Sequence, residues 1–310
     1  MKHFIPAFLI ILSVSGAAHA KTLEEMFPGR SDLPEKERQF FQSFDFQQGP
    51  VALNAATATL NIPKDFYYLD PAATRKVLVD LWGNPPAAAD GTLGMIFPAR
   101  YLPADDDAWG SVVDYEADGH VSDAEANSID YDDLLKQIQQ GIAEKNGERE
   151  KQGFEPITLV GWASPPHYDQ AEHALHWARE LIFGKGEDVR HTLNYSVRML
   201  GREGVLQFDF VAAMSQLDEI KDSIPTVTKL VAFDSGATYT DYRNGDKIAA
   251  YGMAGMIAAG AGAKLAAKFG LFAAIALLLK KGGFLVVLAG GAGAWKFITG
   301  LFRRNRTPRS

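Results

Sequence analysis

The stretch Leu193-Asn-Tyr-Ser-Val-Arg-Met-Leu-Gly201-Arg-Glu-Gly204-Val-Leu-Gln-Phe-Asp-Phe210 decides the fold. Apolar residues alternate with polar ones from Leu193 to Met199, and the alternation resumes from Leu206 to Phe210. A period of two is that of a strand with one buried face. The segment Gly201–Gly204 supplies a turn, so the stretch predicts an antiparallel hairpin.

Working outward from this hairpin, strands and single helices alternate along the chain. We expect further strands over residues 51–62, 66–69, 94–97, 108–115, 157–162 and 227–233. We expect helices over residues 35–44, 70–83, 130–146, 170–183 and 215–223, the last ended by Pro225. Asp70-Pro71 and Asp169 are typical helix starts. This mixture predicts an α+β domain with a largely antiparallel sheet.

The domain organisation follows from the composition of the two ends. Residues 1–20 have the pattern of a cleavable signal peptide: Lys2, an apolar core over Phe4–Val14, and Ala18-His19-Ala20 before the cleavage site. We expect an N-terminal helical segment over residues 21–48 and an exported α+β domain over 49–246. The two Trp-x-x-Pro-Pro segments that begin at Trp82 and Trp162 allow two lobes, 49–150 and 151–246.

The C-terminal region is apolar and interrupted by lysines. Residues 247–302 predict helices that anchor the chain to a membrane, followed by a basic tail at 303–310. The segment Gly282–Phe302 is the best candidate for a span, because the arginines after it would then be cytoplasmic. Ala250, Ala254, Ala258 and Gly262 form a small-residue ladder through which helices associate closely. The alternative is a buried helical hairpin of a soluble domain.

These features predict an inner-membrane protein whose soluble domain faces the periplasm. Expected partners are membrane lipid, other envelope proteins, or a second copy through the small-residue ladder. The formal net charge of −7 disfavours binding to nucleic acid. The absence of cysteine excludes disulfides, thiolate metal sites and a thiol nucleophile.

One loop has the spacing of a calcium site. In Asp114–Glu125, acidic residues stand at positions 1, 3 and 5, glycine at 6 and glutamate at 12. The candidate ligands are Asp114, Glu116, Asp118, His120 and Glu125. The competing interpretation is a turn at Asp118-Gly119 followed by a helix cap, and on that interpretation no cofactor is expected.

The histidines and tryptophans suggest two other kinds of site. His173 and His176 are three apart in the helix expected over residues 170–183, with His167 and Glu172 nearby, which would suit a zinc site. Trp82, Trp109 and Trp162 could line a sugar-binding groove. Helix packing and core packing explain the same residues.

Several short motifs together resemble the family called domain of unknown function 2167, which consists of uncharacterised membrane-anchored bacterial proteins. They are Leu81–Pro86, Gly94 with Pro98, Gly119–Ala126, Leu193–Tyr195, Leu200–Leu206, Phe233 with Gly236, and Gly245–Gly252. His120 stands where we expect an aromatic residue of the family, and Glu125 where we expect another acidic one. The resemblance implies an envelope-facing domain followed by a membrane anchor, and it implies no activity.

Two functions are therefore considered. The first is a non-enzymatic binding or structural module, since no nucleophile motif such as G-x-S-x-G or S-x-x-K occurs in the exported region. The second is a membrane-tethered hydrolase of envelope material that uses a pair of carboxylates. Whether the protein is an enzyme is left open.

Overall fold

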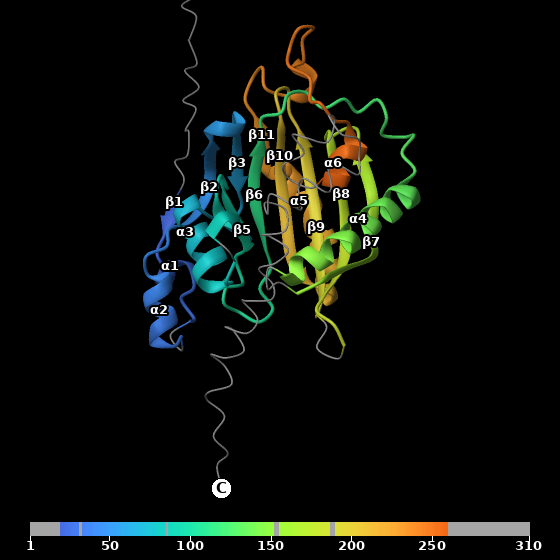
Figure 1. Ribbon diagram of the computed structural model, residues 1–310. Coiled ribbons are helices and arrows are strands. Elements are labelled where there is room, and N and C mark those ends of the chain that lie inside the picture. The colour runs from blue at the N-terminus through green and yellow to red at the C-terminus, as the bar shows by residue number, and fades with distance from the viewer. Residues whose placement is uncertain (1–18, 31–32, 85, 152–154, 187–189, 260–310) are drawn as a thin grey trace, which may run out of the picture.

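The structure is a computed structural model that describes residues 19–30, 33–84, 86–151, 155–186 and 190–259 (Figure 1). Its centre is one sheet with strand order β11-β3-β2-β4-β5-β6-β10-β9-β8-β7, and β1 pairs with β2. All of these strand pairs are antiparallel. The described part of the chain is therefore an α+β fold on an antiparallel sheet, as predicted.

The elements follow one another in simple order. The strands are β1 His19–Lys21, β2 Phe46–Leu53, β3 Ala58–Ile62, β4 Phe66–Leu69, β5 Gly94–Pro98, β6 Gly110–Glu116, β7 Ile157–Asp169, β8 Ala174–Phe183, β9 Arg190–Leu200, β10 Val205–Ala213 and β11 Val231–Phe233. The helices are α1 Leu23–Met26, α2 Glu35–Phe41, α3 Pro71–Arg75, α4 Tyr131–Lys151, α5 Leu217–Leu230 and α6 Met253–Ala259. A π-helical segment, Lys76–Leu81, extends α3.

The hairpin predicted over residues 193–210 is confirmed as β9 and β10. Arg198 lies opposite Gln207 and Tyr195 opposite Phe210 in its register. The other side of β10 pairs with β6, so the hairpin lies in the middle of the sheet. Because β6 comes from the first expected lobe and β10 from the second, one continuous sheet runs through both.

Both faces of the central strands are covered. On the first face, Tyr195, Phe208 and Phe210 pack against helix α5 and strands β2 to β4. On the second face, α4 and α6 cover the β7–β8 end, and α1 to α3 cover β4 and β5 (Figure 1). The polar positions of β9 and β10 point to this second face between the two groups of helices.

The helix expected over residues 170–183 is wrong, because this segment contains the strand β8. Asp169, interpreted as a helix cap, accepts hydrogen bonds from the amides of Ala171 and Glu172 (2.8 and 3.1 Å) within the β7–β8 turn. An aspartate side chain makes the same contact in a turn as at a helix start. The strand is buried on both faces, so apolar residues follow no clean alternation.

Pro225 does not end its helix, which continues to Leu230. A proline inside a helix removes one hydrogen bond and costs about 3 kcal/mol. Ile224, Val227 and Leu230 are buried on either side of it, and this burial offsets the cost. The strand expected over 227–233 is therefore confined to Val231–Phe233.

The C-terminal region predicted as a membrane anchor begins inside the folded domain. In α6, Met253, Met256 and Ile257 are at most 1% exposed and pack against α4 and the sheet. Residues 260–310, including Gly282–Phe302, lie outside the described residues. Among the described helices, none combines the length and the apolar character that crossing a bilayer requires.

Helix α4 protects the outer edge of β7. The Gln139 amide donates to the carbonyl oxygens of Leu159 and Val160, both at 3.1 Å. The Asn146 side chain binds both the amide and the carbonyl of Ile157, at 2.9 and 2.8 Å. Side chains of α4 thus take the place of a further strand along residues 157–160.

Candidate functional site

Two regions carry polar side chains in unusual surroundings. The first, the polar face, is the second face of the central strands. Its side chains come from four neighbouring strands and are mostly buried. It consists of Asp114 on β6, Arg179 on β8, Asn194, Ser196 and Arg198 on β9, and Gln207 and Asp209 on β10.

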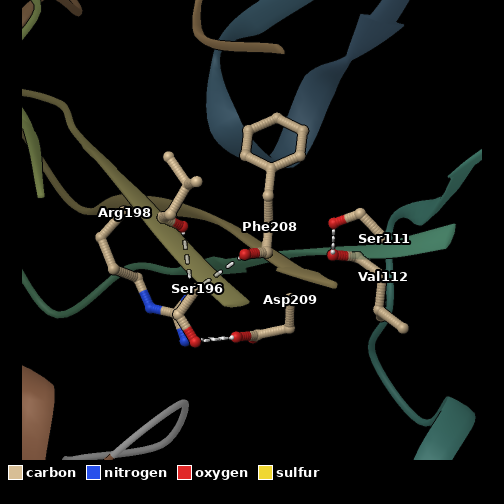
Figure 2. Close-up of polar contacts among 7 residues, drawn as sticks. Ser111, Val112, Ser196, Arg198, Phe208 and Asp209 are labelled. Atoms are coloured by element: carbon tan, nitrogen blue, oxygen red, sulfur yellow. Dashed lines mark hydrogen bonds and ion pairs between the residues drawn. The ribbon is translucent and has the colours of Figure 1, made fainter. Parts of the chain in front are cut away.

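An ion pair lies at the centre of the polar face. The guanidinium of Arg198, whose side chain is fully buried, binds both carboxylate oxygens of Asp209 through Nη2, at 2.9 and 3.0 Å. The hydroxyl of Ser196 donates to the same carboxylate at 2.7 Å. Figure 2 shows these groups on one side of the sheet and the Phe208 ring on the other. The guanidinium also lies 5.2 Å from the ring centroid of Trp177.

The burial of this region perturbs two charged groups. Burial, with a smaller contribution from the Asp209 carboxylate, raises the pKa of Asp114 to about 7, although Arg198 acts in the opposite direction. Burial lowers the pKa of Arg179 to about 10, against the attraction of Asp209. A carboxyl group whose pKa lies near neutrality therefore shares this face with the carboxylate that Arg198 binds.

The second region, the junction, lies where the loops of the sheet hold residues 236–252. Arg202 in the β9–β10 turn binds Asp246 through Nε and Nη2, both at 2.8 Å. The amide of His120 donates to the carbonyl of Lys247 at 2.8 Å, and its carbonyl accepts from Ala249 at 2.9 Å. These contacts fix the segment that leads into α6.

Aromatic rings reinforce the junction. The ring of His120 lies between those of Tyr239 and Tyr242, with centroid distances of 4.4 and 4.2 Å. The ring is 9% exposed, and its Nδ1 has no hydrogen-bond partner among the described residues. Burial lowers the pKa of His120. The ring of His173 is tilted against that of Tyr239, with a centroid distance of 4.4 Å, and its Nδ1 lies 3.1 Å from the Tyr168 hydroxyl.

The five predicted calcium ligands are spread over the polar face, the end of β6, the junction and the start of α6. Asp114 belongs to the polar face, and Glu116 ends β6. Asp118 and His120 lie in the junction, where the Tyr251 hydroxyl bonds to Asp118. Glu125 accepts the amide of Ala254 at the start of α6, at 3.1 Å.

Among the described residues, no group of three or more His, Asp or Glu side chains is placed to hold a metal ion. Calcium binding thus stays a prediction.

The predicted histidine cluster has a different geometry. His167 and His176 lie opposite each other on β7 and β8, with ring centroids 5.1 Å apart, and His176 bonds to the Tyr195 hydroxyl at 2.9 Å. His173 is in the β7–β8 turn and belongs to the junction instead. Because the segment is a hairpin and not the expected helix, His173 and His176 do not share a face.

The comparisons with known proteins agree with the short motifs. A family model described as protein of unknown function (DUF2167) matches residues 45–291. The chain belongs to this family. Within the DUF2167 match, the motifs Gly119–Ala126, Leu200–Leu206 and Gly245–Gly252 meet at the junction.

No curated protein matches this DUF2167 chain. Among solved structures it is similar to the solution structure of cyanobacterial PsbP (CyanoP) from Synechocystis sp. PCC 6803, with 14% sequence identity. The match covers 60% of this chain and 91% of that chain, with a TM-score of 0.32. A TM-score this low does not establish a shared fold.

The polar face of the DUF2167 domain was not predicted as a site. Arg198 and Asp209 occupy the polar positions of the alternating hairpin, which a sequence pattern assigns to solvent. The pattern gives no sign that helices flank the second face as well.

Proposed function

We propose that this DUF2167 protein is a non-enzymatic module of the bacterial envelope. Its sheet domain faces the periplasm, its C-terminal region anchors it to the inner membrane, and the domain holds an envelope partner near that membrane. The observation that carries the proposal is the convergence of the family motifs on the junction.

The contacts at the junction are structural in kind. A side chain at Gly119 would lie 2.5 Å from the carbonyl oxygen of Lys247, and one at Gly252 would overlap the Glu125 carboxylate. Gly119 also has a φ of +104°, which favours glycine. These residues bring backbones together, which supports a structural role for the junction.

The burial of α6 supports a later start for the proposed anchor than the sequence suggested. Residues up to Ala259 belong to the domain core, so the anchoring region would begin after Ala259 rather than at residue 247. The arginines from Arg303 onward support a cytoplasmic C-terminus. A truncation at Asp246 would remove four core residues of α6, so assays belong on the full chain.

The hydrolase alternative loses its expected cleft. Trp82, Trp109 and Trp162 belong to three different hydrophobic clusters. The indole N–H groups of Trp82 and Trp162 donate to the carbonyls of Pro103 and Tyr131, at 3.0 and 3.2 Å, and that of Trp109 bonds to Glu219. The tryptophans therefore support the domain core rather than one sugar-binding groove.

Site-specific photocrosslinking in cells tests the proposal. The probe replaces Ile248, which is 61% exposed at the junction, and the control probe replaces Val160, which is 43% exposed beside α4. We expect a discrete protein adduct from position 248 and none of the same mass from position 160. Identical adducts at both positions, or turnover of an envelope substrate by the purified full chain, would overturn the proposal.

Topology is tested separately. Reporter domains inserted after Asp246 and Lys281, with the rest of the chain kept, and fused after Ser310 should give a periplasmic signal at Asp246 and a cytoplasmic one at Ser310. A periplasmic signal at Ser310 would contradict the single-span anchor, and a cytoplasmic one at Asp246 would contradict export.

A further inference from the structure

The junction contains a turn in which an asparagine is followed by a glycine. The Asp246 amide donates to the Arg243 carbonyl at 3.0 Å, which closes a four-residue turn with Asn244 and Gly245 at its centre. Both central residues are exposed, and Gly245 has a φ of +103°, which favours glycine. The turn is tied to the central hairpin because Asp246 binds Arg202.

An asparagine followed by a glycine can react within its own chain. The backbone nitrogen of the glycine attacks the side-chain carbonyl carbon, a new carbon–nitrogen bond forms, and the bond to the side-chain nitrogen breaks. That nitrogen leaves as ammonia and takes the amide proton with it. Water then opens the resulting succinimide ring at either of its two carbonyls, which gives aspartate or isoaspartate. Asparagine and water thus become an acidic residue and ammonia, without an oxidant or a cofactor.

The structure leaves both reacting groups of this pair accessible. Among the described residues, neither the Asn244 side chain nor the Gly245 amide takes part in a hydrogen bond. Apart from its chain neighbours, no atom lies within 4 Å of a Cβ placed on Gly245, so the space around its backbone is open. The reaction requires the side chain to rotate onto an amide that loses its proton, and hydrogen bonds at either group would oppose it.

The chain contains the same dipeptide in the opposite situation, at Asn146 and Gly147 within α4. The Asn146 side chain is fixed, because it binds both the amide and the carbonyl of Ile157 at 2.9 and 2.8 Å. Inside a helix, the glycine amide is engaged by the carbonyl four residues earlier. The two pairs are chemically identical, so a difference in their reaction rates reports their structure.

We propose that Asn244 is a site of spontaneous deamidation and that its isoaspartate product loosens the junction. Isoaspartate carries the backbone through the former side chain, which lengthens the chain by a methylene group before Gly245. The turn that places Asp246 would lose its geometry, and a new carboxylate would stand close to the Asp246 carboxylate in sequence. Both changes oppose the two-point pairing of Asp246 with Arg202. This inference is independent of the function proposed above.

The modification is tested by ageing the purified full chain in mildly alkaline buffer at growth temperature. Peptide mass spectrometry follows both Asn-Gly pairs, and fragmentation distinguishes isoaspartate from aspartate. We expect Asn244 to convert several-fold faster than Asn146 in the folded protein, and both to convert at similar rates in urea. Equal rates in the folded protein, or an Asn244 that stays intact there while both residues convert in urea, would overturn the proposal.

The effect on the junction is tested by hydrogen exchange at the amides of His120 and Ala249, which hold its backbones together. We expect several-fold faster exchange in the aged protein than in the fresh one. Asn244→Gln should show no change on ageing, because glutamine closes its larger ring much more slowly. Freshly purified Asn244→Asp adds the charge without the methylene group, and its exchange should be intermediate. Exchange that stays unchanged in a chain converted to isoaspartate would refute the loosening of the junction.

Discussion

Arg202 and Asp246 form a two-point ion pair, Nε to Oδ2 and Nη2 to Oδ1, both 2.8 Å, across 44 residues of sequence. Asp246 also accepts the amide of Arg243 at 2.7 Å, and these hydrogen bonds hold the pKa of Asp246 at about 2. The pair ties the central hairpin to the segment that leads into α6. The C-terminal segment is therefore fastened to the sheet before the apolar region begins.

The first prediction concerns this fastening. Asp246→Ala should expose the backbone around Lys247 and Ala249, because the bonds from His120 would lose their support. We expect several-fold faster hydrogen exchange at the amides of His120 and Ala249, which donate these two bonds, with β8 unchanged. Arg202→Lys keeps the charge but cannot bind at two points, so its exchange should be intermediate. Wild-type exchange rates in both variants would mean that the pair contributes nothing to the junction.

The second prediction is a pH dependence at His120. The folded protein holds this ring neutral, with its pKa below the ordinary 6.5, and the unfolded chain takes up a proton near 6.5. The stability supplied by the neutral ring is thus present above pH 6.5 and lost as the pH falls below it. Asp123 and Asp246 favour the charged ring, whereas burial and His173 disfavour it more.

His120→Phe is the matched variant, since it keeps a ring between Tyr239 and Tyr242 and removes the titration. Its melting temperature relative to wild type should rise as the pH falls from about 7 to about 5. If the melting temperatures of the two proteins change with pH in the same way, His120 makes no contribution to the pH dependence of stability.

The third prediction concerns the ion pair of the polar face. Asp209→Ala leaves the buried Arg198 without its carboxylate, and we expect the free energy of unfolding to fall by about 3–5 kcal/mol. The double variant Arg198→Met with Asp209→Leu should recover most of this loss. Urea denaturation measures both. An Asp222→Ala control, on the exposed side of α5, should change stability by less than about 0.5 kcal/mol.

The fourth prediction has the opposite pH sign. Asp114 has a pKa raised from 3.8 to about 7, so the folded state keeps a proton that the unfolded state releases. Its stabilising contribution is present below about pH 4 and is lost as the pH rises to about 7. Asp114→Asn should therefore be more stable than wild type above pH 7, by roughly 2 kcal/mol. Equal stability of both proteins from about pH 4 to pH 8 would refute the shift.

The fifth prediction separates the two interpretations of the loop Asp114–Glu125. Because Glu125 is bonded to the start of α6, we expect the same melting temperature in millimolar calcium and in chelator. A calcium-dependent rise that Glu125→Gln abolishes would instead establish the calcium site, since a ligand that binds only the folded state raises its stability.

Local rules predicted the parts of the fold that are decided locally. The hairpin 193–210 has strict alternation, Asp70 caps α3 by accepting the amide of Ala73 at 2.8 Å, and α4 has a continuous helical sequence. The prediction of a helix over residues 170–183 failed because β8 is buried on both faces and follows a turn that Asp169 stabilises. The prediction that Pro225 ends its helix failed because the burial of its apolar neighbours outweighs the free-energy cost of a proline inside the helix.

The two candidate regions could be predicted to different degrees. The junction residues were found through the family motifs, but the pairing of Arg202 with Asp246 depends on the fold. The polar face has no sequence pattern that distinguishes it, because Arg198 and Asp209 stand at positions that the alternation assigns to solvent. Their burial depends on the packing around the second face, which a strand pattern does not show.

The shielded edge of β7 restricts how copies of this protein can associate. The backbone of residues 157–160 is already bonded to Gln139 and Asn146 of the same chain. A neighbouring molecule finds no open backbone ladder there, so sheets cannot join end to end along this stretch and grow into fibrils. Two copies that associate at this edge would have to do so through side-chain contacts, which require surfaces of matching shape.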